Sequence, residues 1–331
     1  MLKTITYRNT IVLKGIMKRN KLLGGLLGLC IGDALGLPVE FKPRSALKAT
    51  PVTDMIGYGT HNQPPGTWSD DSSLTFCLAE SLCNGFNLRD IAAKFVKWLY
   101  EGYWTPYGEV FDAGNITRTA ITRLKEGVNP LKAGSTDEFS NGNGSLMRIL
   151  PLAFYLEKSD IEQQFEITHQ VSCLTHRHLR SQIACGIYIQ VAINLLKGNT
   201  PKEAYENMKC TVSDYYSKWP YITELHHFNR IIESDISGLP EAAIKSSSYV
   251  VDTLEASLWC LLNSNSYADT VLTAVNLGGD TDTLGAVTGG LAGIYYGYDG
   301  LPQKWVTRLA RAKDIIELGE RLYRAIYKAQ I

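Results

Sequence analysis

The stretch NLGGDTDTLGAVTGGLAGIYYG, residues 276–297, joins a short acidic motif to a regular repeat of glycine. Asp280 and Asp282 stand one residue apart, directly after Gly278 and Gly279. The run that follows is almost free of charge, and glycine recurs in it at Gly285, Gly289, Gly293 and Gly297. Because residues four apart lie on the same side of a helix, this spacing predicts a helical ridge made of glycine.

A second ridge of the same kind stands near the other end of the chain. The segment GGLLGLCIGDALGLPVEF, residues 24–41, carries glycine at Gly24, Gly28, Gly32 and Gly36. A glycine inside a helix costs roughly 1 kcal/mol relative to alanine, so a compensating interaction is needed. We expect both ridges to be close-approach faces of helices, packed against each other in the centre of the protein. Loops or loosely packed helices are the alternative interpretation of the same glycines.

The rest of the chain is dominated by helical spacing. In LRDIAAKFVKWLY, residues 88–100, the apolar residues fall on one stripe of a helix. The same pattern predicts helices over residues 72–82, 116–124, 146–156, 182–196, 254–262 and 305–327. Strand alternation is scarce, and no Pro/Gly/Ser-rich linker divides the chain. We therefore predict an all-α fold with a single compact domain over residues 20–331. It is preceded by an extension, residues 1–19, that is expected to be either disordered or without a functional role.

Composition argues against several classes of protein. The chain has 331 residues with 33 basic and 33 acidic side chains, so it lacks the positive charge of a dedicated duplex-binding protein. Seven cysteines without a CxxC pair or a secretory leader indicate reduced thiols and a cytoplasmic location. The longest weakly polar run, residues 284–298, is shorter than the roughly 20 residues that cross a bilayer, so we expect no membrane partner. The sequence leaves the oligomeric state open.

Another acidic motif, which comes first in chain order, is GTWSDDSSLTF at residues 66–76; it contains Ser69, Asp70 and Asp71. Its ordinary explanation is capping of a helix start, and the same explanation applies to Asp280 and Asp282. Each motif, however, offers two carboxylates beside a Ser or Thr hydroxyl and contains neither His nor Cys. Such all-oxygen sets suit Mg²⁺, Mn²⁺ or Ca²⁺ rather than zinc or copper. If the fold brings the motifs together, the four carboxylates need a cation between them to remain ionised.

Six motifs, taken in order along the chain, resemble the ADP-ribosylglycohydrolase family. They are GDALGLPVEF (32–41), GTWSDDSSL (66–74), DAGNIT (112–117), GNGSLMRILPLA (142–153), LTHRH (174–178) and GGDTDTLGAVTGGLAG (278–293). The resemblance covers roughly residues 21–327 and implies an all-α fold with a binuclear Mg²⁺ or Mn²⁺ centre. The metal ligands it implies are Ser69, Asp70, Asp71, Asp280, Asp282 and Thr283. Ser69 stands where family members often carry threonine, but the oxygen ligand is retained.

The resemblance also implies a reaction, which is hydrolysis at the anomeric carbon of a ribose. ADP-ribose would be released from a modified protein side chain or a small molecule. Glu40 matches a glutamate that lies near the metals in some family members. It is the first candidate for the general acid or base, and Asp112 is the second. Without the resemblance, the ordinary interpretation is that Glu40 is a solvated carboxylate and Asp112 is a turn residue. Asp33 is expected to have a supporting role.

The resemblance assigns the ADP-ribose cradle to Gly142, Asn143, Gly144 and Ser145. Glycine permits close approach of the backbone, and Ser145 is predicted to begin a helix whose N-terminus attracts anions. Without the resemblance, this segment reads as an ordinary turn. Arg148 is expected to make either a structural ion pair or a phosphate contact. His176 matches a position beside the nucleotide, and the alternative for it is a core or capping histidine.

Two other functions are left open by the residues. A pair of metal ions would also serve a nucleotide phosphohydrolase. A protein that binds ADP-ribose without cleaving it is the second alternative. The sequence does not select the linkage that is cleaved, because arginine, serine, a nucleic-acid base or a guanidine-like small molecule can each carry ADP-ribose.

Overall fold

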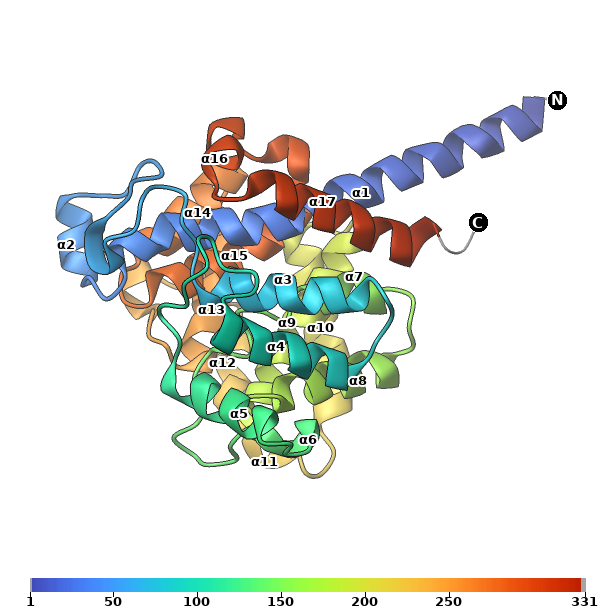
Figure 1. Cartoon of the computed structure of the whole chain (residues 1–331). Coiled ribbons are helices and arrows are strands. Elements are labelled where there is room, and N and C mark those ends of the chain that lie inside the picture. Colours follow the sequence, from blue (N-terminus) through green and yellow to red (C-terminus); the bar gives the residue numbers. More distant parts are fainter. Residues whose placement is uncertain (1, 329–331) are drawn as a thin grey trace.

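Two helices from opposite ends of the chain form the centre of the fold. The computed structural model describes residues 2–328, with side chains from residue 15 to residue 327. Helix α1 (Leu2–Gly36) packs against α15 (Thr281–Tyr296) along most of its buried length (Figure 1). Glycines face each other in three pairs, Gly24 with Gly293, Gly28 with Gly289 and Gly32 with Gly285. The two helices are therefore antiparallel, and the predicted packing of the two ridges is confirmed.

The contact between the ridges leaves no room for a side chain. A Cβ atom added to Gly32 would lie 1.9 Å from the carbonyl oxygen of Gly285, and one added to Gly289 would lie 2.3 Å from that of Gly28. These distances are shorter than any van der Waals contact, so the helix backbones touch directly. This close approach holds the segment that begins at Thr281 against the C-terminal end of α1.

The two ends of the predicted ridges differ from the expectation. Gly36 faces the backbone of Thr281, with a Cβ-to-oxygen distance of 2.1 Å, and has no glycine opposite. Gly297 lies beyond the last residue of α15 and has a φ of 73°. It packs against the side chain of Asn20. Its left-handed backbone ends the helix, which is a common use of glycine at a helix C-terminus.

The described residues form helices and turns, with three isolated β-bridges in place of strands. The α-helices around the central pair are α2 (Arg44–Ala49), α3 (Asp70–Leu82), α4 (Leu88–Glu101), α5 (Asn115–Lys125), α6 (Pro130–Ala133), α7 (Pro151–Leu156), α8 (Ile161–Cys173), α9 (Leu179–Leu196), α10 (Pro201–Tyr216), α11 (Ile222–Leu225), α12 (Asn229–Ile232), α13 (Val250–Leu262), α14 (Tyr267–Asn276), α16 (Gln303–Arg308) and α17 (Ala312–Tyr323). Short 3₁₀ helices are η1 (Leu37–Val39), η2 (Gly59–His61), η3 (His226–Phe228), η4 (Ile236–Gly238), η5 (Glu241–Ala243) and η6 (Tyr298–Gly300), and a π-helical turn, Arg324–Lys328, follows α17. The all-α, single-domain prediction is confirmed.

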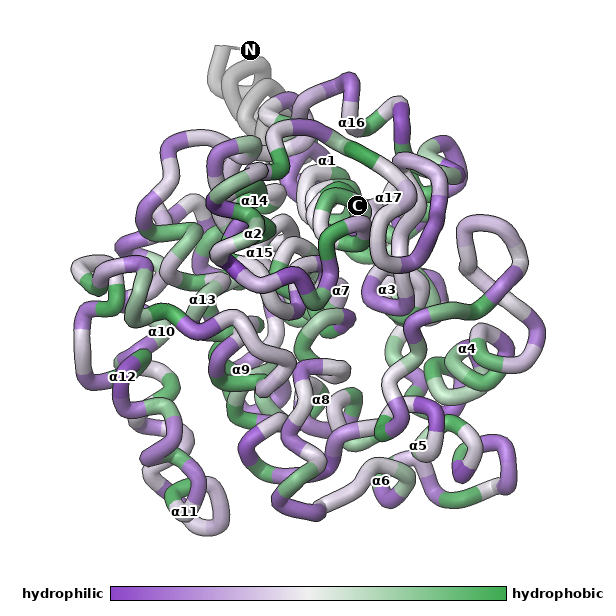
Figure 2. Tube along the Cα trace, turned by 90° about the vertical axis from the view of Figure 1, so that its left-hand side faces the viewer, coloured by the Kyte–Doolittle hydropathy of each residue, from purple (hydrophilic) through white to green (hydrophobic). Residues whose placement is uncertain are grey.

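Helices α7, α9 and α15 lie in the middle of the molecule, whereas α4, α6, α11 and α12 lie at its periphery (Figure 2). Two segments, 15–39 and 179–196, are long and apolar enough to cross a bilayer by length and composition alone. Their apolar windows are 100% and 94% buried within the protein. Both segments are therefore core helices of this fold.

Two predicted helices are interrupted, the first by a proline and the second at a contact with a distant segment. The helix predicted over residues 146–156 begins only at Pro151, because proline has no N–H to donate into a preceding helical turn. Residues 144–150 form turns instead, so the helix start predicted at Ser145 is wrong. The helix predicted over residues 305–327 is divided at Arg311, which has a φ of 53°. There the Ala310 N–H donates to the Gly66 carbonyl at 2.9 Å rather than within a helix.

The boundary predicted after residue 19 falls inside α1, whose backbone is helical from Leu2. The side chains of residues 1–14 lie outside the described part of the chain. That residues 1–19 have no functional role stays a prediction.

Candidate metal centre and substrate cleft

The first acidic motif stands at the start of α3. Ser69 is the N-cap residue, and its hydroxyl oxygen accepts a hydrogen bond of 3.3 Å from the Asp71 N–H. The same hydroxyl donates to the Asp71 carboxylate at 2.9 Å. Capping therefore accounts for Ser69. It does not account for the carboxylates of Asp70 and Asp71, which are buried.

Helix α1 supports this motif through Asp33, which follows Gly32 of the glycine ridge. The Asp33 carboxylate accepts hydrogen bonds from the Ser69 N–H at 3.0 Å and from the Ser72 N–H at 3.1 Å. It also accepts one from the Ser72 hydroxyl at 2.6 Å. Burial raises the pKa of Asp33 to about 7. The Asp33 side chain thus holds the first turn of α3 in place, which is the supporting role expected for it.

The second acidic motif meets the first at the N-terminus of α15. The Thr283 hydroxyl donates a hydrogen bond of 3.3 Å to the Asp71 carboxylate. Carboxylate oxygens of Asp33, Asp71 and Asp282 lie within 4.8 Å of one another, and so do those of Glu40, Asp280 and Asp282. The prediction that the two motifs fold into one oxygen-lined site is confirmed.

This site has the chemistry of a site for hard cations. Burial, with neighbouring carboxylates adding to it, raises the pKa of Asp70, Asp71 and Asp282 well above the usual range. One oxygen each of Asp71 and Asp282 is buried without a hydrogen-bond partner among the described residues. Buried carboxylates without such partners are costly unless a cation compensates them. The residues present therefore fit divalent cations with a preference for oxygen ligands.

A cavity of about 300 Å³ opens beside the acidic site. Its lining includes nine of the predicted site residues, Glu40, Asp70, Asp112, Gly142, Asn143, Gly144, His176, Asp280 and Thr283. Ser69, Asp71 and Asp282 are buried beneath it, where the two motifs meet. Ser145 is fully buried away from the cavity and accepts a hydrogen bond of 3.0 Å from the Ser172 hydroxyl. The structure thus brings the candidate residues to one place, with Ser145 behind the cradle rather than in it.

The glycine loop is tied directly to the acidic site. The Asn143 side-chain amide donates to the Asp280 carboxylate at 3.0 Å and to the Thr253 hydroxyl at 2.9 Å. The Asn143 N–H donates to the Ser248 carbonyl at 3.0 Å. Because Asn143 shares a hydrogen bond with Asp280, the glycine loop and the acidic motif of α15 have a fixed mutual position.

His176 covers the glycine loop from the other side. Its Nδ1 lies 2.8 Å from the Thr175 hydroxyl, and its ring lies so near Gly144 that a Cβ there would be 2.8 Å from Cε1. Burial lowers the pKa of His176 to about 3, so the ring is neutral at physiological pH. A neutral imidazole beside the cavity can stack or hydrogen-bond without adding charge.

Arg148 takes neither of the two roles expected for it. Its guanidinium donates to the carbonyl oxygens of Gly144 and Val171 and lies 4.9 Å from the centre of the Phe95 ring. It does not line the cavity, and its contacts among the described residues are these two carbonyl groups and this ring. Burial lowers its pKa to about 10. Arg148 therefore braces the glycine loop from the protein interior.

His61 belongs to this site although no motif in the sequence predicts it. Its Nε2 is hydrogen-bonded to the Glu40 carboxylate, and the same nitrogen lies 3.9 Å from the Asp112 carboxylate. This histidine is thus placed between the two candidate acid–base residues. The available signal was its position in the Gly- and Pro-containing loop 57–66, directly ahead of the first acidic motif.

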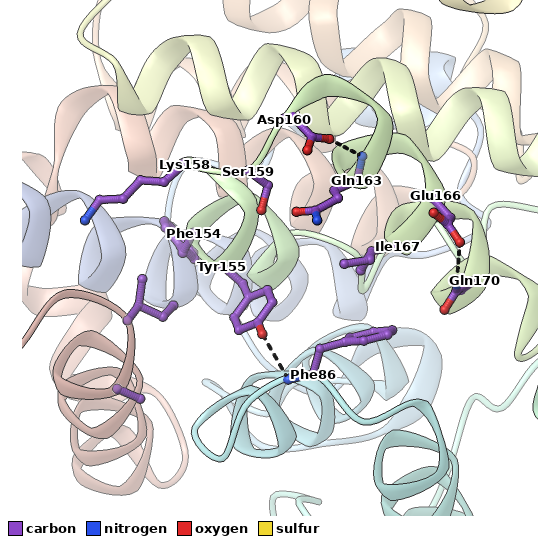
Figure 3. A pocket seen from close by; sticks show the side chains of 12 residues that line it. Phe86, Phe154, Tyr155, Lys158, Ser159, Asp160, Gln163, Glu166, Ile167 and Gln170 are labelled. Carbon is purple, nitrogen blue, oxygen red and sulfur yellow. Dashed lines mark hydrogen bonds between the residues drawn. The ribbon is translucent and has the colours of Figure 1, made fainter. Parts of the chain in front are cut away.

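A larger cavity lies elsewhere and lacks this chemistry. It has a volume of about 830 Å³ and is lined by side chains of α7, α8 and the C-terminal segment together with Phe86 (Figure 3). Its carboxylates have ordinary partners, because Asp160 caps α8 through the Gln163 N–H at 2.8 Å and Glu166 accepts from Gln170 at 3.1 Å. Chemistry rather than size therefore selects the smaller cavity as the candidate active site.

The fold and the cleft together define a class, the all-helical proteins in which a buried carboxylate site adjoins a glycine-containing loop. A solved structure titled "ADP-ribosylglycohydrolase-related protein complex" has this fold, with a TM-score of 0.78 and 32% identity over 93% of this chain and 98% of that one. The family model described as ADP-ribosylglycohydrolase matches residues 16–331. The chain belongs to the ADP-ribosylglycohydrolase family and is a hydrolase that acts on glycosidic linkages of ADP-ribose.

Curated relatives cover most of the chain. An ADP-ribosylarginine hydrolase, Tri1, of Serratia proteamaculans is 34% identical over 92% of this chain and 79% of its own length. The ADP-ribosyl-[dinitrogen reductase] glycohydrolase of Rhodospirillum rubrum is 30% identical over 88% of this chain and 90% of its own length. The ADP-ribosylhydrolase ARH3 of Danio rerio is 26% identical over 92% and 89%. Modified proteins are thus the class of substrate to which these relatives' names point.

Proposed function

We propose that this chain is a metal-dependent hydrolase that releases ADP-ribose from arginine side chains of modified proteins. The observation that carries the proposal is a single cavity in which the acidic site, the glycine loop and two further carboxylates meet. An arginine leaving group is cationic. Glu40 and Asp112, which line the cavity beside the acidic site, complement the charge of a guanidinium better than that of a neutral serine.

The proposal gives each group of residues a task. Ser69, Asp70, Asp71, Asp280, Asp282 and Thr283 would hold two Mg²⁺ or Mn²⁺ ions. When bound, such ions supply positive charge that orients the hydroxyl groups of a ribose and lowers the pKa of water. The backbone of residues 142–144 would receive the pyrophosphate, since glycine allows close approach.

Glu40 and Asp112 would exchange protons with the reacting groups. Burial raises the pKa of Glu40, and burial together with the charge of Glu40 raises that of Asp112 to about 6. A carboxyl group whose pKa lies near the working pH can both donate and accept a proton efficiently. Asp112 is such a group, and the pKa of Glu40 is shifted in the same direction. Together the two groups would carry the proton transfers at the ribose and at the leaving nitrogen.

We also propose that the protein acts in a reducing compartment such as the cytoplasm. All seven cysteines are unpaired, and five of them are buried. Protection of thiols inside the core supports this location but does not bear on the reaction.

The decisive experiment is a screen of defined ADP-ribosylated substrates with Mg²⁺ and Mn²⁺ supplied in parallel. Peptides modified at arginine, peptides modified at serine and ADP-ribosyl guanidine would be incubated with the protein, and the products separated by chromatography. We expect intact ADP-ribose and unmodified arginine peptide. Asp282→Asn should remove turnover while the far-ultraviolet circular dichroism spectrum stays unchanged. Release of AMP would contradict the proposal and favour phosphohydrolysis, and binding without turnover would favour a reader of ADP-ribose.

A further inference from the structure

We propose that His61 is a positioning residue for the reaction, which holds Glu40 at the cleft and links it to Asp112. The inference rests on the proposed function and extends it to a residue outside the acidic motifs. His61 does not line the cavity, whereas Glu40 and Asp112 do. It therefore acts through Glu40 rather than on the substrate.

The loop that carries His61 is docked on the segment that carries Glu40. The Thr60 hydroxyl donates a hydrogen bond of 2.8 Å to the backbone carbonyl of Glu40. Gly59, with a φ of 62°, lies so close that a Cβ there would be 1.9 Å from the Pro38 carbonyl oxygen. The Tyr58 N–H closes the loop on the Gln63 carbonyl at 2.5 Å. Side-chain and backbone contacts on both sides of His61 thus fix where its ring can lie.

The other side of the ring faces the segment that carries Asp112. The Phe111 ring lies 5.7 Å from the imidazole, centre to centre, and Asp112 has a left-handed φ of 53°. The side chain of Glu40 is 4% exposed, that of His61 18% and that of Asp112 21%. His61 is therefore the point where three separate stretches of chain converge at the edge of the cleft.

The position of Glu40 needs such a partner. Its carboxylate lies within 4.8 Å of ligand atoms of Asp280 and Asp282, and like charges at this range repel. The charged groups that face the His61 ring are Glu40 and Asp112, with Asp33 farther away. A hydrogen bond from the imidazole opposes the repulsion on Glu40 and favours one rotamer of its side chain. Without it, the carboxylate would leave its place at the cavity wall.

Kinetics of His61→Ala, His61→Gln, Glu40→Gln and the double variant His61→Ala/Glu40→Gln test this role. Because a misplacement of about 1 Å can reduce a rate roughly 100-fold, we expect His61→Ala to lower kcat by about 10- to 100-fold while KM changes by less than about twofold. His61→Gln keeps a side-chain donor and should recover part of the loss. The double variant should be no slower than Glu40→Gln, because a residue that acts through Glu40 has no effect once Glu40 is disabled.

Controls separate this inference from the proposed function. His226→Gln, an exposed histidine bonded to the Thr223 carbonyl, should leave kcat unchanged. Additive losses in the double variant, or an unchanged kcat in His61→Ala, would overturn the role of His61. If the wild-type protein turns over none of the substrates, the proposed function fails, and the contact is judged by nuclear magnetic resonance. The ¹⁵N resonance of His61 Nε2, assigned with His61→Gln, should then move in Glu40→Gln; an unmoved resonance rejects the contact.

Discussion

The Thr283 hydroxyl lies 3.3 Å from the Asp71 carboxylate, although 212 residues separate the two in sequence. Both residues stand in the first turn of a helix, Asp71 in α3 and Thr283 in α15. Since α1 contacts both helices, through Asp33 on one side and the glycine ridge on the other, one helix sets the distance between the two motifs. The acidic site thus depends on a backbone contact in the core as much as on its own side chains.

Divalent cations should stabilise the folded protein. The buried carboxylates repel one another without a cation, so Mg²⁺ or Mn²⁺ at about 100 times its Kd should add roughly 2.7 kcal/mol to the free energy of unfolding. The measurement is thermal melting with and without the cation, with a chelator as reference. Asp282→Asn should lose most of the shift. Without metal at pH 7, however, this variant should melt at least as high as the wild type, because it removes a carboxyl group whose ionised form is disfavoured by burial and by the neighbouring carboxylates. A metal-free variant much less stable than the metal-free wild type would contradict this account.

Replacement of Gly289 by leucine should prevent folding. Even a single Cβ at this position would lie 2.3 Å from the Gly28 carbonyl oxygen, and the backbones of the two helices would have to move apart to accept it. The loss should exceed the roughly 1–3 kcal/mol typical of overpacked cores. Gly238→Ala is the matched control, since nothing lies within 4 Å of a Cβ there. Equal melting temperatures for Gly289→Leu and the wild type would reject the role of the ridge.

The sequence predicts those features that depend on local pattern and chemistry. A four-residue glycine spacing identifies a close helix contact, and paired carboxylates beside hydroxyls identify an oxygen site, without knowledge of the partner segment. The late start of α7 follows from Pro151, but two other misses depend on tertiary contacts. The break before α17 arises because the Ala310 N–H bonds to Gly66, far away in sequence. The place of His61 depends on loop 57–66 docking on Glu40. Neither contact produces a periodic pattern in the sequence.

Ser145 shows a different limit of prediction from sequence. Residues 142–144 line the cavity, but the side chain of Ser145 does not. The cradle formed by residues 142–144 lines the cavity, whereas Ser145 turns inwards to Ser172. Pro151 delays the helix start beyond the cradle, so the anion-binding helix N-terminus expected there is replaced by turns. Anion binding would then rest on backbone groups of the loop itself.

His169 should make the protein sensitive to acid. It is buried, its two ring nitrogens lie 2.8 Å from the hydroxyls of Tyr216 and Tyr221, and burial lowers its pKa to about 3 from 6.5. Because the unfolded chain takes up this proton first, the stabilising contribution of neutral His169 is complete above about pH 6.5 and is lost as pH falls from there towards 3.

The comparison of wild type with His169→Gln isolates this effect. Denaturant titrations at several pH values should show the wild type losing stability relative to the variant by about 1.4 kcal/mol per pH unit below 6.5. A difference between the two proteins that stays constant over this range would mean that His169 does not titrate on unfolding.

The glycine loop offers a matched pair of substitutions that tests its role in binding ADP-ribose. A Cβ at Gly144 would lie 2.8 Å from His176 and 3.0 Å from the Thr117 hydroxyl, whereas at Gly142 the nearest atoms are 3.7 and 3.8 Å away. Gly144→Ala must displace the His176 ring, so we expect the Kd for ADP-ribose to rise about tenfold, equivalent to roughly 1.4 kcal/mol. The new methyl group of Gly142→Ala makes only ordinary contacts within the protein. Any weaker binding of ADP-ribose in this variant must therefore come from contact between the methyl group and the ligand. Isothermal titration calorimetry with ADP-ribose in the presence of Mg²⁺ measures both. Unchanged affinity in the two variants would exclude residues 142–144 as the cradle, whereas a loss in Gly144→Ala alone would assign the effect to the displaced histidine.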